Sequence, residues 1–198
     1  MKTLPKKFIL SIRPKEYLKQ GTSHCGVYSL KAILSAYGKD VKAHPKEYQS
    51  NWIGRNYFSL ATGEKYYDKI FASYGLRTET NSAKKLSDQK RLELLKTLLV
   101  NNTPVMIRVG NGYLNEKYNP LLGRLIPHWI TLWGYDDEKQ LFYVYDSGLP
   151  KQYWSEKIPI GNTTRTYREI LRDWNYGNWQ VWSWNTSNKN YLYVQIQN

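Results

Sequence analysis

The stretch QGTSHCGVYSLKAILSAYG, residues 20–38, contains the only cysteine of the 198-residue chain, Cys25. Apolar residues recur behind this cysteine every three or four positions, which predicts an amphipathic helix. We expect Thr22 or Ser23 to cap the N-terminus of the helix and Gly38 to end it. Cys25 is therefore predicted to lie in the first turn of a helix, after a polar loop.

The predicted position of Cys25 favours a reactive thiol. The thiolate is the nucleophilic form of cysteine, and the ordinary pKa of a thiol is about 8.5. The unpaired N–H groups at a helix N-terminus favour negative charge and lower that pKa. A lone cysteine is more often a small buried apolar residue. The choice between these two interpretations depends on whether the chain supplies a base.

The order of predicted elements is typical of an α+β protein. No linker, repeat or low-complexity segment divides the sequence, so we treat residues 1–198 as a single domain. Helices dominate the first half, strands follow, and residues 128–147 form a predicted β-hairpin. Beyond residues 23–37, we expect helices at 66–74, 86–100 and 166–174, and further strands at 105–109, 180–184 and 191–197.

One of the three histidines stands out as a base for the thiol. His24 is adjacent to Cys25, so its side chain is expected to point away from it, at the rim of the molecule. His44 precedes a proline and is predicted to lie in a loop. His128 begins a strand, and a strand can bring an imidazole across a cleft to a helix. We therefore predict His128 as the general base.

An acidic residue and an amide complete the predicted site. Asp146 follows the second strand of the hairpin and lies nearly opposite His128, within reach of its ring. Asp136 and Asp137 are rivals, but they occupy the distant tip of the hairpin. Gln20 is upstream of the helix, and its side-chain amide can stabilise an oxyanion together with the backbone N–H of Cys25.

Four segments of the chain carry a resemblance to a known family: QGTSHCGVYSL, NTPVMIRV, HWITLWGY and VYDSG. They resemble the papain-fold cysteine peptidases, and most closely the bacterial leader peptidase domains of bacteriocin exporters and their stand-alone, double-glycine peptidase-like relatives. The resemblance spans about residues 15–150. It implies a helical layer with a central Cys-bearing helix, packed on a mainly antiparallel sheet. It also implies Cys25 as nucleophile, His128 as base, Asp146 as its orienting partner and Gln20 in the oxyanion hole.

Charge and composition narrow the partners. The formal net charge is +13, but the lysines are scattered and accompany no nucleic-acid-binding motif, so we expect a peptide or protein substrate rather than nucleic acid. No metal-ligand spacing or phosphate-binding glycine loop occurs, and no cofactor is expected. The sequence as written shows no signal peptide and no apolar run of membrane-spanning length, which favours a cytoplasmic protein. The oligomeric state is not predicted.

Two alternatives to a peptidase stay open at this point. The same fold and residues also suit a deamidase or transglutaminase-like toxin or effector, which would be secreted or delivered into another cell. A nonenzymatic module that binds anionic partners through its positive charge is the second alternative. Four tryptophans between residues 174 and 184 are expected to form aromatic core, or else a wall for a ligand.

Overall fold

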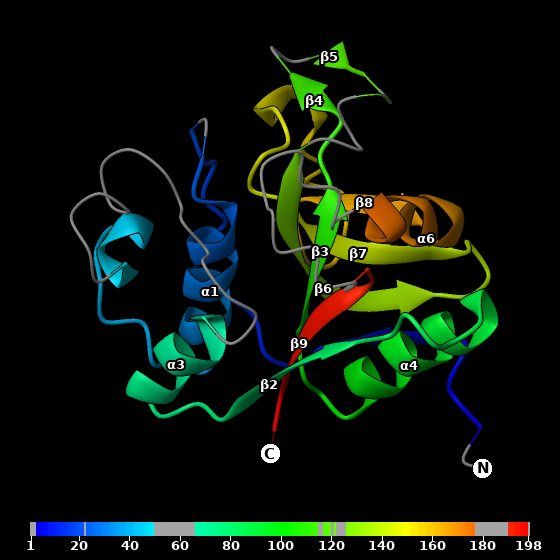
Figure 1. Cartoon of the computed structure of the whole chain (residues 1–198), viewed down its shortest axis with the longest axis horizontal. Helices are drawn as coiled ribbons and strands as arrows, with labels where there is room; N and C mark the ends of the chain where they lie inside the picture. Colours follow the sequence, from blue (N-terminus) through cyan, green and yellow to red (C-terminus); the bar gives the residue numbers. More distant parts are fainter. Residues whose placement is uncertain are drawn as a thin grey trace.

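The predicted division into helices followed by antiparallel strands is present in the computed structural model (Figure 1). The structure describes residues 3–21, 23–49, 66–114, 117–119, 121, 126–176 and 190–197. The described helices are α1 (Cys25–Ala36), η1 (Pro45–Tyr48), α3 (Tyr66–Ser73), α4 (Asp88–Val100), η2 (Lys151–Tyr153) and α6 (Tyr167–Tyr176). The described strands are β1 (Lys7–Ile9), β2 (Thr78–Ser82), β3 (Val105–Gly110), β4 (Tyr113–Leu114), β5 (Lys117–Tyr118), β6 (Pro127–Asp136), β7 (Leu141–Tyr145), β8 (Thr163–Thr166) and β9 (Leu192–Ile196).

The main sheet separates two groups of helices. Its strand order is β2-β9-β3-β6-β7-β8, with β1 paired to the end of β6, and its neighbouring strands are antiparallel. In Figure 1, α1 and α3 lie to the left of this sheet, and α4 and α6 lie to the right. This arrangement is the α+β, papain-like architecture expected from the sequence.

The β6–β7 hairpin forms as predicted and is the centre of the sheet. Thr131 pairs with Tyr145 and Asp136 with Leu141, with a bulge at residues 132–134. Gly134 is required here, because an added Cβ would lie 2.5 Å from the backbone oxygen of Phe8 in β1. The hairpin brings the start of β6 next to the segment that follows β7.

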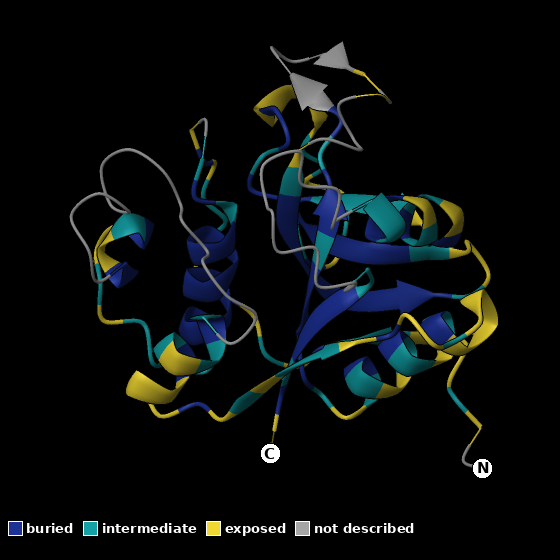
Figure 2. Cartoon of the chain, viewed as in Figure 1, coloured by how far each residue is buried: buried dark blue, intermediate teal, exposed yellow. Residues whose placement is uncertain are grey.

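Helix α1 differs from its prediction, because it is not amphipathic. Residues 26–35 are all buried, and Figure 2 shows the helix dark blue along its length. Even Lys31 is enclosed, and its Nζ donates to the Asp40 carboxylate and the Lys42 carbonyl at 2.6 Å each. Paired in this way, a buried ammonium avoids most of its desolvation cost. The helix is therefore central, as the family resemblance implied, rather than a surface helix.

The ends of α1 follow the prediction only in part. Gly38 has a φ of 67° and Lys39 N–H donates to the Leu34 carbonyl at 2.8 Å, so the helix ends at Gly38 as expected. At the other end the N-cap is His24, and no side chain caps the helix. The prediction of Ser23 was therefore wrong, and Thr22 lies outside the described residues.

Of the four tryptophans between residues 174 and 184, the structure describes Trp174. Trp174 is fully buried and its indole N–H donates to the Leu192 carbonyl at 2.7 Å, so this residue belongs to the core. The other three tryptophans and the strand expected at 180–184 lie outside the described residues. Within the described helices, no segment is long and apolar enough to cross a bilayer.

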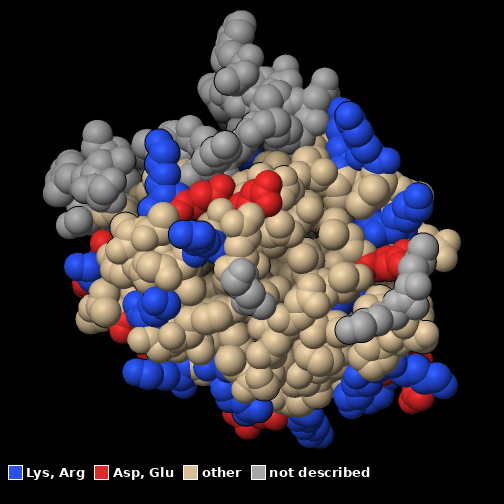
Figure 3. All heavy atoms as spheres, turned by 90° about the horizontal axis from the view of Figure 1, so that it is seen from below, with Lys and Arg blue, Asp and Glu red and all other residues tan. Residues whose placement is uncertain are grey.

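Basic side chains do not gather on the face shown in Figure 3. On that face, Lys and Arg side chains are spread around the outline and alternate with Asp and Glu. Several cations are engaged in ion pairs; for example, Lys96 contacts Asp137 at 2.5 Å. On this face the positive side chains are therefore spread out rather than concentrated in one stripe.

Candidate active site

Cys25 is the first residue of α1 and is only partly buried. It follows His24, whose backbone adopts the left-handed conformation with a φ of 82°. A non-glycine residue rarely takes this conformation, and such residues concentrate at functional sites. The carbonyl of His24 accepts the N–H groups of Val27 and Tyr28, at 3.0 and 3.3 Å. The sharp turn at His24 thus places Cys25 where the loop enters the helix.

His24 itself is not at the rim, as the sequence predicted. Only 2% of it is exposed, and its Nδ1 lies 2.5 Å from the hydroxyl of Ser23. The left-handed backbone explains the difference, because it turns the side chain away from the direction that a regular helical residue would take. His44, in contrast, is exposed and accepts the N–H of Lys46 at 3.2 Å, in the loop position that was expected.

His128 and Asp146 meet at the open end of the β6–β7 hairpin. The Nε2 of His128 donates to Oδ1 of Asp146 at 2.6 Å, and each side chain is 2% exposed. The rival carboxylates lie elsewhere: Asp136 pairs with Lys7 and Asp137 with Lys96 near the turn. The structure therefore brings together the histidine and the aspartate that the sequence singled out.

Cys25 and His128 lie close enough, across the boundary between α1 and the sheet, for each to shift the pKa of the other. Because Nε2 of His128 contacts Asp146, Nδ1 is the ring nitrogen that remains for the thiol. Burial raises the pKa of the Cys25 thiol, but the charge of the nearby His128 and the N–H groups of Trp129 and Gly26 lower it by more, so the net shift is downward. The thiolate is therefore favoured more than in an ordinary cysteine.

The pKa of His128 is shifted in the complementary direction. Burial lowers this pKa, but the negative charges of Asp146 and Cys25 raise it, to about 10. Burial would raise the pKa of Asp146, and the positive charges of His128 and Arg165 hold it well below its usual range. The site therefore favours a thiolate–imidazolium pair backed by a carboxylate.

Asp146 is held by more groups than the sequence suggested. Its carboxylate accepts the N–H of Gly148 at 2.9 Å and a guanidinium N–H of Arg165 at 2.5 Å. The side-chain amide of Asn162 hydrogen-bonds to the backbone of Asp146. It accepts from the Asp146 N–H at 2.9 Å and donates to the Asp146 carbonyl at 2.8 Å. The position of this carboxylate is thus fixed from both the side chain and the main chain.

Gly148 belongs to the site because of its closeness to the imidazole. A Cβ added to this residue would lie 2.9 Å from Cε1 and 3.2 Å from Nε2 of His128. Only glycine lets the backbone pack so closely against the ring. The glycine of the VYDSG segment therefore has a positional role that its turn propensity alone did not reveal.

Gln20 is attached to the same segment. It is 7% exposed, its side-chain oxygen accepts the hydroxyl of Ser147 at 2.6 Å, and its N–H donates to the Ser147 carbonyl at 2.9 Å. The loop before α1 is thereby tied to the residue that follows Asp146. This contact uses the oxygen of the amide and leaves its NH₂ group as the donor.

Three residues of the site were missed from the sequence: Asn162, Arg165 and Gly148. Arg165 lies in β8, and Asn162 is the residue before this strand. The sequence of β8, TTRT, has no alternation of apolar and polar residues that would have predicted a strand. Among the described residues, no group of three or more His, Cys, Asp or Glu is arranged to hold a metal ion.

A helix-borne thiol packed against an antiparallel sheet is the arrangement of papain-like peptidases, and the comparisons agree with this class. The model of the Peptidase_C39 like family matches residues 10–189. The chain belongs to this family, and hydrolysis of peptide bonds is the activity that the family name describes. No curated protein matches the sequence.

Two solved structures are similar in fold. One is a double glycine motif protease from an AMS/PCAT transporter in complex with its leader peptide, with a TM-score of 0.54, 14% identity and 96% of each chain covered. The other is described as a C39-like peptidase from Bacillus anthracis, with a TM-score of 0.56, 13% identity, and 97% of this chain and 98% of that chain covered. At these identities the likeness concerns the fold.

Proposed function

We propose that this protein is a cysteine peptidase that uses Cys25 as nucleophile, His128 as base and acid, and Asp146 as the partner that orients the imidazole. The observation that carries the proposal is the convergence of three groups: the His128 ring contacts the Asp146 carboxylate at 2.6 Å, and Cys25 lies close enough to the same ring for each to shift the pKa of the other. These residues come from the start of α1, the start of β6 and the segment that directly follows β7. Such a nucleophile–base–orienter series is the general requirement of thiol catalysis.

The proposed reaction is acyl transfer through a thioester. The thiolate of Cys25 attacks the carbonyl carbon of the scissile amide, and the negative oxygen accepts N–H bonds from the Cys25 backbone and from the side-chain amide of Gln20. The His128 imidazolium gives its proton to the leaving nitrogen as the C–N bond breaks. Water, deprotonated by the neutral imidazole, then attacks the thioester, and the thiolate and the free carboxylic acid are released.

A peptide or protein is the proposed substrate. One structural relative was crystallised with a leader peptide, and both relatives cover almost the whole chain. Cys25 is partly exposed as a residue, at the start of its helix, where a substrate can approach. Support for this choice over deamidation comes from the family match, since the triad itself performs both reactions.

Mass spectrometry of a synthetic peptide library is the direct test. We expect incubation with the protein to produce fragment pairs whose masses sum to that of the parent peptide plus one water. A sample pretreated with iodoacetamide is the control and should yield no fragments, because its single cysteine is blocked. A gain of about one dalton without fragments would identify a deamidase instead, and an unchanged library would refute hydrolysis of peptides of this kind.

Replacement of Asp146 by asparagine should reduce kcat/KM about a hundredfold or more, but by less than removal of the thiol, because the orienting carboxylate of a triad contributes less than its nucleophile. Asparagine keeps an oxygen that accepts from Nε2 but lacks the charge that supports the imidazolium. Steady-state kinetics on a cleaved library peptide measures the effect. Asp136→Asn, which alters a carboxylate near the hairpin turn, is the matched control and should behave as wild type. A loss as large as that from removing the thiol would show that Asp146 does more than orient the ring.

A further inference from the structure

Arg165 joins two buried carboxylates behind the proposed triad. One nitrogen of its guanidinium donates to Asp146 at 2.5 Å and another to Asp173 of α6 at 3.0 Å. The side chain of Arg165 is 12% exposed, and those of Asp146 and Asp173 are 2% and 5% exposed. In this environment charges interact strongly, so the three groups must be considered together.

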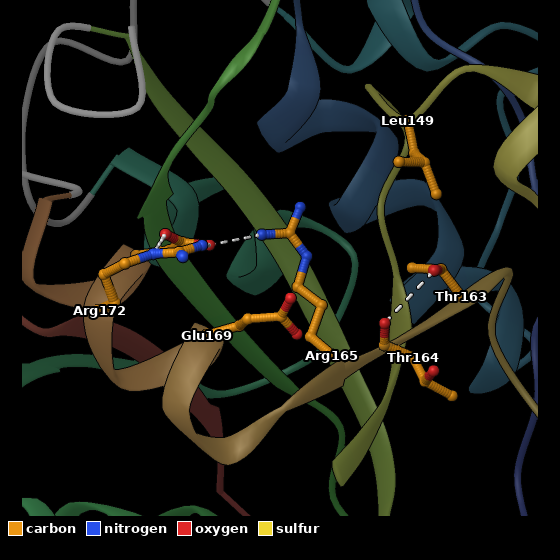
Figure 4. A pocket seen from close by; sticks show the side chains of 7 residues that line it. Leu149, Thr163, Thr164, Arg165, Glu169 and Arg172 are labelled. Atoms are coloured by element: carbon orange, nitrogen blue, oxygen red, sulfur yellow. Dashed lines mark hydrogen bonds and ion pairs between the residues drawn. The ribbon is translucent and has the colours of Figure 1, made fainter. Parts of the chain in front are cut away.

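Arg172 contacts the outer side of the same network. Its Nε donates to Asp173 at 2.7 Å, and 44% of its side chain is exposed. Figure 4 shows the side chains of Arg165, from β8, and Arg172, from α6, extending toward one another beside a cavity of about 220 Å³. Arg172 thus contacts Asp173, and the guanidinium that contacts the triad carboxylate is that of Arg165.

The Asp146 carboxylate is shared between two cations. Its Oδ1 accepts from His128 and from Gly148 N–H, and its Oδ2 accepts from Arg165. A carboxylate whose charge is partly compensated by a guanidinium stabilises a neighbouring imidazolium less than a carboxylate without one. Asp173 opposes this effect, because it compensates part of the charge of Arg165 in turn. The chain of alternating charges therefore sets how firmly the imidazolium holds its proton.

Other charged and titratable groups face the same pair from every side. The charge of Cys25 of α1 acts on the imidazole, and Arg108 of β3 interacts with the charge of Cys25. Tyr145 of β7 is next to Asp146, and its pKa is raised, first by burial and also by the carboxylate, so it is neutral at physiological pH. Besides the imidazolium of His128, the cation in direct contact with the Asp146 carboxylate is Arg165.

We propose that Arg165 is a positioning residue of this enzyme: it holds the Asp146 carboxylate against His128 and moderates the charge that Asp146 presents to the imidazolium. The inference rests on the proposed Cys25–His128–Asp146 mechanism. In that mechanism His128 must release a proton to the leaving nitrogen, and an imidazolium bound too tightly by its carboxylate is a poor acid. Arg165 thereby favours the proton transfer that cleaves an amide.

The test is an NMR titration of the histidine rings in four proteins: wild type, Arg165→Met, Asp173→Asn and Arg172→Met. The chain has three histidines, so the His128 signal is identified by its loss in His128→Ala. We expect the His128 pKa to rise in Arg165→Met, because a compensating cation is lost, and to fall in Asp173→Asn, because Arg165 then acts on Asp146 at full charge. Arg172→Met, an exposed partner of Asp173, should stay close to wild type.

A kinetic comparison separates positioning from simple loss of structure. Arg165→Met should slow peptide hydrolysis about tenfold or more, the order of loss for a misplaced catalytic group, while alkylation of Cys25 by iodoacetamide at pH 7 changes far less. Alkylation requires the thiolate but no proton transfer to a leaving nitrogen. An equal fall in both rates would indicate general damage and overturn the proposal.

The other outcomes of the titration and of the alkylation experiment also decide whether Arg165 has this role. A His128 pKa that is unchanged in both variants, or that moves in the opposite directions, overturns the role of Arg165. If Arg165→Met does not fold, Asp173→Asn decides alone, because asparagine keeps the shape of the side chain. Alkylation that is insensitive to His128→Ala would instead reject the proposed catalytic mechanism itself, so the two failures are distinguishable.

Discussion

Conversion of Cys25 to alanine is expected to abolish peptide hydrolysis, by about 10⁴-fold or more, while the protein remains folded. The loss is large because no other residue of the chain carries a thiol, and removal of a covalent nucleophile leaves only binding and oxyanion stabilisation. The fold should persist because Cys25 is at the edge of the core, partly exposed, and alanine fits its place in the helix. The free energy of unfolding should change by about 1 kcal/mol or less.

Kinetics and thermal denaturation together measure this outcome. The melting curve of Cys25→Ala should lie near that of wild type, and its peptide fragments should fall to the level of the no-enzyme sample. Thr97→Ala, on the exposed side of α4, controls for the effect of substitution in a helix. Unfolding of Cys25→Ala would indicate a structural cysteine, and retained cleavage would show that the nucleophile is another residue.

Loss of the imidazole in His128→Ala should make the thiol of Cys25 behave as an ordinary one. In the native protein, burial raises the thiol pKa, and the charge of His128 is the largest opposing influence, so the pKa is lowered overall. A thiol with the ordinary pKa of about 8.5 is only about 0.3% ionised at pH 6. The rate of alkylation by iodoacetamide at pH 6 should therefore fall about a hundredfold in the variant.

The alkylation rates of wild type and His128→Ala should depend differently on pH. In the native protein the thiolate–imidazolium pair should persist from below the ordinary thiol pKa until His128 loses its proton near pH 10, since its pKa is raised to about 10 despite burial. The two rates should therefore converge above pH 9, where an ordinary thiol ionises unaided. His44→Ala, which removes an exposed histidine, is the matched control. Equal rates for wild type and His128→Ala at pH 6 would contradict the ion pair.

The sequence was most informative where a residue type is rare. One cysteine and three histidines left few ways to combine a nucleophile with a base, and the hairpin prediction placed Asp146 beside His128. In the structure His128 contacts Asp146 at 2.6 Å, and Cys25 lies beside the same ring. Gln20 was singled out as an amide just upstream of the Cys-bearing helix, and no local pattern indicated its attachment to Ser147.

The unpredicted parts depend on tertiary contacts. Strand β1 has only three residues, and β2 and β8 are polar. These segments become strands because β6, β9 and β7 offer them unpaired edges. Arg165 reaches Asp146 only through the pairing of β8 with β7, so nothing in TTRT identifies it. Likewise, the buried faces of α1 follow from its enclosure by other elements, which periodicity alone does not encode.

The place of β9 between β2 and β3 has a consequence for synthesis of the protein. A chain emerging from the ribosome exposes its sulfur early, but the strand that joins the two parts of the sheet arrives more than 160 residues later. Until then β2 has no partner in the sheet, whereas β3, β6 and β7 can already pair with one another and bring His128 next to Asp146. The last strand in chain order therefore completes the sheet on the side away from the hairpin.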